Sequence, residues 1–179
     1  MWYHDVCHRL AWRVNTAAKE TLQLREEDGD HAMPKKTTDI ILAMIALNDG
    51  EPLHQAKVAA FLKKPPPGVP GLELVGQKSE AIVYRVEGAA ASMMLMPAPI
   101  PWSDLEGPCA TAWYWRDATR VMKKHVAHVI VTLMGGGPDI VSRHILLTGF
   151  VAAVAATTNC AGVYWGSGTV VNSAEEFIK

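Results

Sequence analysis

The sequence is poor in cysteine and contains no Cys-x-x-Cys pair. Its three cysteines, Cys7, Cys109 and Cys160, lie far apart and make an odd number. Structural zinc sites and thiol redox centres usually place cysteines in close pairs. We therefore expect free, mostly buried thiols in a reducing compartment, which predicts a cytoplasmic protein.

Net charge is also nearly absent. The chain has 17 Lys and Arg against 18 Asp and Glu, for a formal net charge of −1. This balance argues against a broad surface for nucleic acid or for an acidic membrane. The N-terminus has no basic region followed by a purely apolar run, so no secretory signal is expected.

One long segment, from Ile145 to Val171, has no charged residue at all. Its length is enough to span a bilayer. However, Thr157-Thr158-Asn159 interrupts its middle, and glycines crowd its end. A buried helix followed by a buried strand explains this composition better, so we expect no membrane contact.

Two short segments come near to catalytic motifs without matching them. Gly135-Gly136-Gly137-Pro138-Asp139 follows a predicted strand, but it has no Gly-Lys-Ser/Thr ending, and Asp139 would repel a phosphate. Ser167 lies between two glycines but lacks the Gly-x-Ser-x-Gly spacing of a nucleophile elbow. These segments predict a helix cap and a tight hairpin turn, and we expect neither catalytic residues nor a cofactor.

The histidines do not form a convincing site either. His4, Cys7 and His8 share one face of a helix, but a structural zinc site takes a fourth ligand and none is nearby. His125 and His128 lie three apart at the start of a predicted strand, where they would face opposite sides. We therefore predict no metal, and a structural role for the histidines.

Residues 1–33 differ from the rest of the chain. Val6, Leu10 and Val14 lie on one helical stripe that ends in an acidic run, and Met33 precedes a basic linker. We expect an N-terminal extension over residues 1–33, helical or disordered, and an α+β domain over residues 34–179.

The domain itself alternates strand-like and helix-like segments. Apolar runs of strand length, bounded by turn signals, fall at 39–47, 72–75, 81–86, 90–96, 126–134, 161–165 and 169–171. Helical spacing or caps predict helices over 51–63, 118–125 and 140–156. Close runs joined by short turns indicate a meander, so we predict a mixed, mainly antiparallel sheet covered by helices.

The C-terminus predicts one more helix, with Ser173 and Glu176 as a capping box. This helix is short, and Phe177 and Ile178 would need a surface against which to be buried. We therefore expect the domain to be incomplete after Lys179. The exposed edge would then make self-association possible.

Three aromatic segments are the main functional lead. They are Met96 to Trp102, Trp113-Tyr114-Trp115, and Val163-Tyr164-Trp165-Gly166. Together they hold four of the six tryptophans, and each lies at a predicted strand end or turn. Large amphipathic rings at such places either lock the ends of a sheet or form a binding patch. The predicted patch consists of Trp102, Trp113, Trp115, Tyr164 and Trp165.

These three segments, together with the strand and turn from Ile130 to Gly137, resemble the bacterial domain-of-unknown-function family 4261 (DUF 4261). The resemblance covers about Met33 to Lys179. It implies further strands and helices after the position of Lys179. It brings no catalytic residues that can be carried over to this chain.

Two functions follow as hypotheses. The first is a non-catalytic intracellular domain that binds another protein through the aromatic patch. The alternative is an enzyme or small-ligand-binding domain with a cleft beside Trp102, Trp113 and Trp165. A concave pocket with convergent polar groups would favour the second, and a flat or convex apolar patch the first.

Overall fold

The computed structural model describes residues 40–63, 71–78, 80–86, 88–137 and 139–179. The chain divides into two compact units, Met1–Thr37 and Thr38–Lys179, and every described residue belongs to the second unit. The expected N-terminal extension, with His4, Cys7 and His8, lies outside the described residues.

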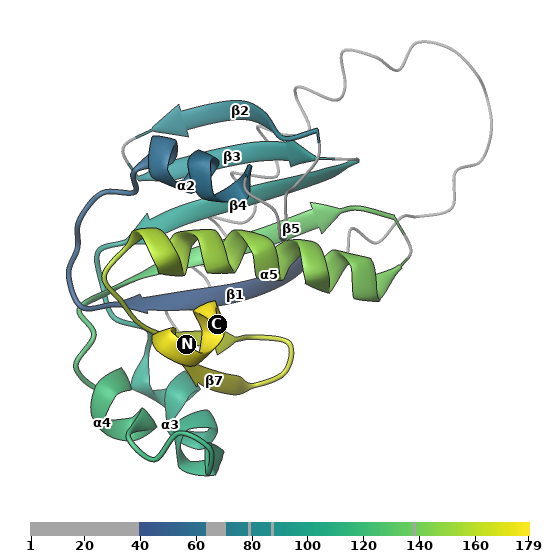
Figure 1. The fold of residues 1–179 in the computed structure, drawn as a ribbon. Helices are drawn as coiled ribbons and strands as arrows, with labels where there is room; N and C mark the ends of the chain where they lie inside the picture. The colour runs from purple at the N-terminus through teal and green to yellow at the C-terminus, as the bar shows by residue number, and fades with distance from the viewer. Residues whose placement is uncertain (1–39, 64–70, 79, 87, 138) are drawn as a thin grey trace. The chain divides into compact units, whose positions relative to one another are not determined.

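A seven-stranded sheet forms the centre of the second unit, in the order β2-β3-β4-β5-β1-β6-β7 (Figure 1). Every pairing between these strands is antiparallel, so the expected α+β class is confirmed, and the parallel pairs of a mixed sheet do not occur among the described strands. The strands are β1 (Ile40–Leu47), β2 (Glu73–Lys78), β3 (Ala81–Val86), β4 (Ala89–Met96), β5 (Ala127–Gly135), β6 (Cys160–Trp165) and β7 (Val170–Ser173).

Sequence neighbours pair along most of the sheet, which confirms the expected meander of β2, β3 and β4. The exception is β1, which lies between β5 and β6 and pairs with both along most of its length. Because β1 has neighbours on both sides and side chains packed on both faces, its residues form a continuous apolar run instead of an alternating one.

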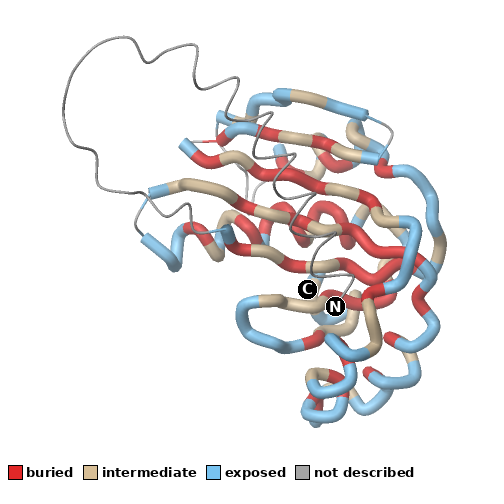
Figure 2. Tube along the Cα trace, turned by 180° about the vertical axis from the view of Figure 1, so that it is seen from behind, coloured by how far each residue is buried: buried red, intermediate tan, exposed pale blue. Residues whose placement is uncertain are grey.

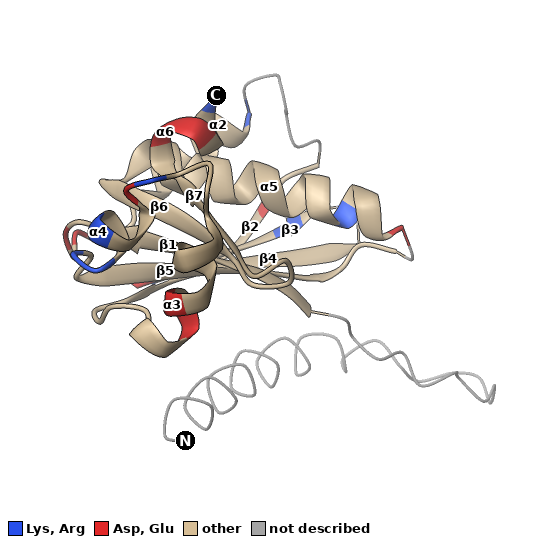
Figure 3. Ribbon diagram, turned by 90° about the horizontal axis from the view of Figure 1, so that it is seen from below, with Lys and Arg blue, Asp and Glu red and all other residues tan. Residues whose placement is uncertain are grey.

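The first face of the sheet is covered by α2 (Gln55–Leu62), α5 (Ile140–Thr157) and α6 (Ala174–Ile178). Phe150, Leu147 and Val154 of α5 are buried against alternate residues of the strands. In the described part of the chain, α5 is the one helix long and apolar enough to cross a membrane. Here it packs lengthwise on the sheet, followed by a buried strand, as the sequence predicted (Figure 3).

The second face carries α3 (Trp102–Thr111) and α4 (Ala118–Met122), which pack near β1, β6 and β7. Figure 3 shows α3 on the opposite side of the sheet from α5 and α6. Leu105 and Cys109 of α3 and Met122 of α4 are buried in this second, smaller cluster. The central strands between the two clusters are the most buried part of the chain, as Figure 2 shows.

Side-chain N-caps form at α5 and α6 but not at α2, α3 or α4. The Asp139 carboxylate accepts a hydrogen bond from the Val141 backbone N–H at 3.0 Å and caps α5. Gly135 is tightly constrained in the preceding turn, because it has φ of 78° and an added Cβ would approach the Gly88 carbonyl oxygen to 2.7 Å. Gly166–Thr169 is a turn between β6 and β7, which agrees with the predicted hairpin.

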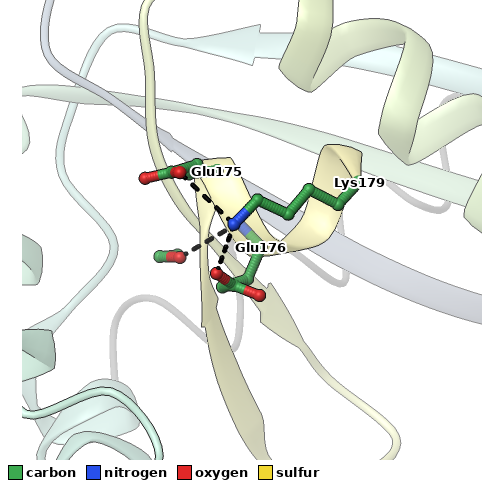
Figure 4. A network of polar contacts seen from close by, with 4 residues as sticks. Glu175, Glu176 and Lys179 are labelled. Atoms are coloured by element: carbon green, nitrogen blue, oxygen red, sulfur yellow. Dashed lines mark hydrogen bonds and ion pairs between the residues drawn. The ribbon is translucent and has the colours of Figure 1, made fainter.

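Two local expectations need correction. Helix α3 was not predicted, because Gly107 and Pro108 inside it and Pro101 before it are typical helix breakers. Helix α2 begins at Gln55, four residues after Glu51, the predicted start. At the C-terminal helix, Phe177 packs on the first-face cluster, whereas Ile178 is 41% exposed. Lys179 bonds Glu176 at 2.7 Å and pairs with Glu175 at 3.3 Å at the end of α6 (Figure 4).

Candidate protein-binding site

The structure divides the predicted aromatic patch between the two faces of the sheet. Tyr164 and Trp165 are consecutive in β6, so their side chains point to opposite sides. Trp165 packs with the first-face cluster, whereas Tyr164, Trp102 and Trp115 pack with the second-face cluster. None of the aromatic ring pairs found among the described residues joins the three segments. The five residues therefore do not form one patch.

Trp165 serves to close the first face. Its ring lies 5.8 Å from the His144 ring of α5 and 6.3 Å from the Phe177 ring of α6, measured between centroids. It thus links β6 to the two helices that cover this face. Its half-buried position between elements of the same chain indicates a packing role.

Trp115 packs tightly against strand β6 on the second face. An added Cβ on Gly162 would come within 2.7 Å of the Trp115 indole and 3.0 Å of the Met122 sulfur. Gly162 therefore leaves a notch in β6 that admits the edge of the indole ring. This close approach fixes the loop between α3 and α4 on the sheet.

Trp102 begins α3 and is also half-buried on this face. The Lys123 ammonium lies over its ring at 4.6 Å from the centroid, in cation–π geometry. Asp104, one turn into the same helix, is among the causes that raise the pKa of Tyr164, after burial of the phenol. Trp102 and Tyr164 are therefore placed near charged side chains, with part of each ring exposed.

Trp113 behaves differently from all the other predicted residues, because 85% of it is exposed. Its ring meets the Tyr114 ring edge-on, with 5.7 Å between centroids and an interplanar angle of 84°. The Tyr114 hydroxyl donates a hydrogen bond to the Val171 carbonyl at 2.8 Å, which ties the loop to β7. Backbone bonds from Trp113 to Thr111 and from Trp115 to Ala112 tighten this loop further. An exposed indole is thus carried on a loop with fixed ends.

Basic side chains follow Trp113 closely along the chain. Arg116, Arg120, Lys123 and Lys124 are all exposed, while Ala118 and Met122 of α4 are buried, so the cations line the outer side of this segment. Asp117 pairs with Arg120 at 2.9 Å, and this hydrogen-bonded pair lowers the pKa of Asp117. We call Trp113, Tyr114, Arg116 and Lys124 the Trp113 surface. Lys123 is not part of it, because its ammonium lies over Trp102 at the other end of α3.

Two buried histidines, for which the sequence predicts only a structural role, hold the backbone before α3 and at the end of α4 by hydrogen bonds. His125 Nε2 accepts a hydrogen bond from the Ile100 N–H at 2.7 Å, and its Nδ1 donates to the Met122 carbonyl. His128 Nδ1 lies 2.6 Å from the Ala98 carbonyl. Burial lowers the pKa of both histidines. They hold the backbone of the Pro97–Pro101 segment against β5. The one sequence signal for these contacts is the proline content of that segment, because prolines lack the N–H groups that would pair it with a neighbouring strand.

Metal-ligating groups and thiols were the remaining candidates for a site. No group of three His, Cys, Asp or Glu side chains that could hold a metal occurs among residues 40–63, 71–78, 80–86, 88–137 and 139–179. Cys109 and Cys160 are free thiols, and burial raises the pKa of Cys160 to about 12. A thiol with so high a pKa is a poor nucleophile at neutral pH.

Comparison of the chain with protein-family models, with curated proteins and with solved structures finds no match. The resemblance to DUF 4261 therefore stays a prediction. The fold is an antiparallel α+β domain, and the segment between α3 and α4 on its second face carries an exposed tryptophan, followed in sequence by exposed basic residues.

Proposed function

We propose that this chain is a non-catalytic intracellular domain that binds another protein through the Trp113 surface. The observation that carries the proposal is the exposure of Trp113, 85% of whose surface is open to solvent. Tryptophan, tyrosine and arginine are the residues most enriched at the energetic centres of protein interfaces. All three occur here within Trp113, Tyr114 and Arg116.

The loop that carries Trp113 is suited to binding because its conformation is fixed in advance. Tyr114 is bonded to β7, Trp115 is inserted beside Gly162, and Ala118 is buried. A side chain on a fixed support loses less conformational entropy on binding than one on a free loop. The free energy gained by burying the Trp113 ring would then be available for affinity.

The geometry favours a protein partner over the alternative of a small-ligand cleft. Trp165 lies on the first face, whereas Trp102 lies on the second, so the sheet separates two of the three residues of that cleft. Trp113 projects into solvent instead of lining a concavity with them. A projecting ring fits into a pocket on a partner.

A displayed peptide library selected on the chain tests the proposal. We expect the selected peptides to lose at least about tenfold in affinity for Trp113→Ala, as removal of a central aromatic anchor requires. Ile145→Ala is the matched control, because Ile145 is an exposed apolar residue on α5, at the other face. Peptides that bind Trp113→Ala as tightly as the unmodified chain would overturn the proposal.

A further inference from the structure

We propose that the partner segment recognised by the Trp113 surface is acidic. This inference rests on the proposed protein-binding function and adds the chemistry of the partner. The stretch from Trp113 to Lys124 has four basic residues and one acidic residue, although the whole chain has a net charge of −1. The positive charge is therefore concentrated in the chain segment that carries the exposed indole.

The local charge is not neutralised within the domain. Asp117 is paired with Arg120. In the part of the chain that the structure describes, no carboxylate forms an ion pair with Arg116, Lys123 or Lys124. Lys123 is instead drawn over the Trp102 ring. Arg116 and Lys124 are thus left to attract carboxylates of a partner, which speeds encounter and selects against basic partners.

An acidic protein segment fits this surface better than a nucleic acid does. Proteins that bind nucleic acid commonly neutralise about six to ten phosphates. The Trp113 surface supplies two cations, and the exposed carboxylates of Asp104 and Glu106 lie on α3, the helix that ends just before Trp113. A continuous phosphate backbone would approach these carboxylates, whereas a short acidic segment can end before them.

An anionic membrane is also a poorer fit for this surface than an acidic protein segment. A stable membrane contact combines several apolar side chains inserted at the interface with a basic cluster. The exposed aromatic residues here are Trp113 and Tyr114, and the Tyr114 hydroxyl is bonded to Val171. One indole with two cations on the same segment is a small anchor for a bilayer but a sufficient one for a pocket on a protein.

The test uses three synthetic peptides of equal length, which alternate leucine with glutamate, glutamine or lysine. The probe signal is the Trp113 indole N–H in a two-dimensional ¹H–¹⁵N spectrum, assigned by its loss in Trp113→Phe. We expect the glutamate peptide to shift this signal and to bind more weakly at high salt. Arg116→Glu combined with Lys124→Glu should weaken its binding about tenfold. Lys57→Glu combined with Lys78→Glu is the control, because it makes the same charge change at exposed sites on α2 and β2.

The outcomes separate this inference from the function on which it rests. Equal binding of the glutamine peptide through Trp113 would overturn the acidic preference and leave protein binding in place. Equal loss of binding in the Lys57 and Lys78 control would show a non-specific charge effect and would also overturn it. Tighter binding of oligothymidylate or of phosphatidylserine vesicles would assign the surface to another class of partner. If no peptide shifts the Trp113 signal, both proposals fail.

Discussion

The two faces of the sheet are closed by different physical means. One long helix, α5, covers much of the first face with aliphatic side chains and Phe150, all packed on alternate strand residues. The second face is closed by the short helices α3 and α4, by the indole of Trp115 and by hydrogen bonds from His125 and His128. Apolar burial dominates the first face, whereas fitted rings and polar contacts define the second.

This difference explains where the candidate site lies. A large apolar core tolerates few polar or exposed features, since unpaired polar groups are costly to bury. The second cluster is smaller and does not require every apolar side chain near it to be buried. Its loop can therefore expose Trp113, while Trp115, two residues later, is packed against β6. The proposed binding surface therefore lies on the face with less apolar burial.

The largest expected effect comes from removing the Phe150 ring. Phe150→Ala should lower the free energy of unfolding by about 3–5 kcal/mol, because the ring is fully buried in the first-face cluster. Leu105→Ala removes a smaller side chain from the second cluster and should cost about 2–3 kcal/mol. Urea titration measures both. A greater loss for Leu105→Ala would reverse the proposed ranking of the two faces.

The notch at Gly162 is the next target. Gly162→Ala should cost about 1–3 kcal/mol, because the new methyl group would clash with the Trp115 ring and with the backbone carbonyl of Asn172. Gly107→Ala is the control, since Gly107 lies within α3 with open space around its Cα. There alanine should be neutral or slightly stabilising. Equal unfolding midpoints for the two variants would disprove a tight Trp115 contact.

A smaller effect is expected from acid. Burial lowers the pKa of His125 below its ordinary 6.5, so its imidazole is protonated more readily in the unfolded chain than in the folded chain. The contribution of neutral His125 to the free energy of unfolding is complete above pH 6.5. It is lost as the pH falls through 6.5 toward the lower pKa of the folded state. Protonation of Nε2 also removes the acceptor for the Ile100 N–H.

His125→Gln keeps a side-chain acceptor and should reduce this loss of stability between about pH 7 and 5. Urea midpoints measured across that range give the comparison. The control is His54→Gln, at an exposed position before α2, which should keep the original pH profile. An unchanged profile in His125→Gln would assign the acid sensitivity elsewhere.

The smallest effect on stability belongs to Trp113. Trp113→Ala should change the free energy of unfolding by less than about 0.5 kcal/mol, because the ring is mostly in solvent. Tyr114→Phe should cost more, about 0.5–1.5 kcal/mol, since it removes the hydrogen bond to Val171. Thermal unfolding of the two variants is sufficient. A large loss in Trp113→Ala would show that this ring belongs to the core.

The sequence alone determined the elements whose signals are local. The apolar run of β1, the meander of β2 to β4, the Asp139 cap and the long helix α5 were all predicted, because strand and helix patterns are read over a few residues. Sequence could not show that Trp113 is exposed and Trp115 packed, since the two lie in one short aromatic run.

Only the tertiary structure decided how those elements combine. It placed β1 between β5 and β6, which are distant from β1 along the chain, and brought Gly162 against Trp115. It also formed α3 across Gly107 and Pro108, where burial of Leu105 and Cys109 outweighs poor helix propensity. Pairing and close packing between distant residues depend on the whole core, so no local pattern specifies them.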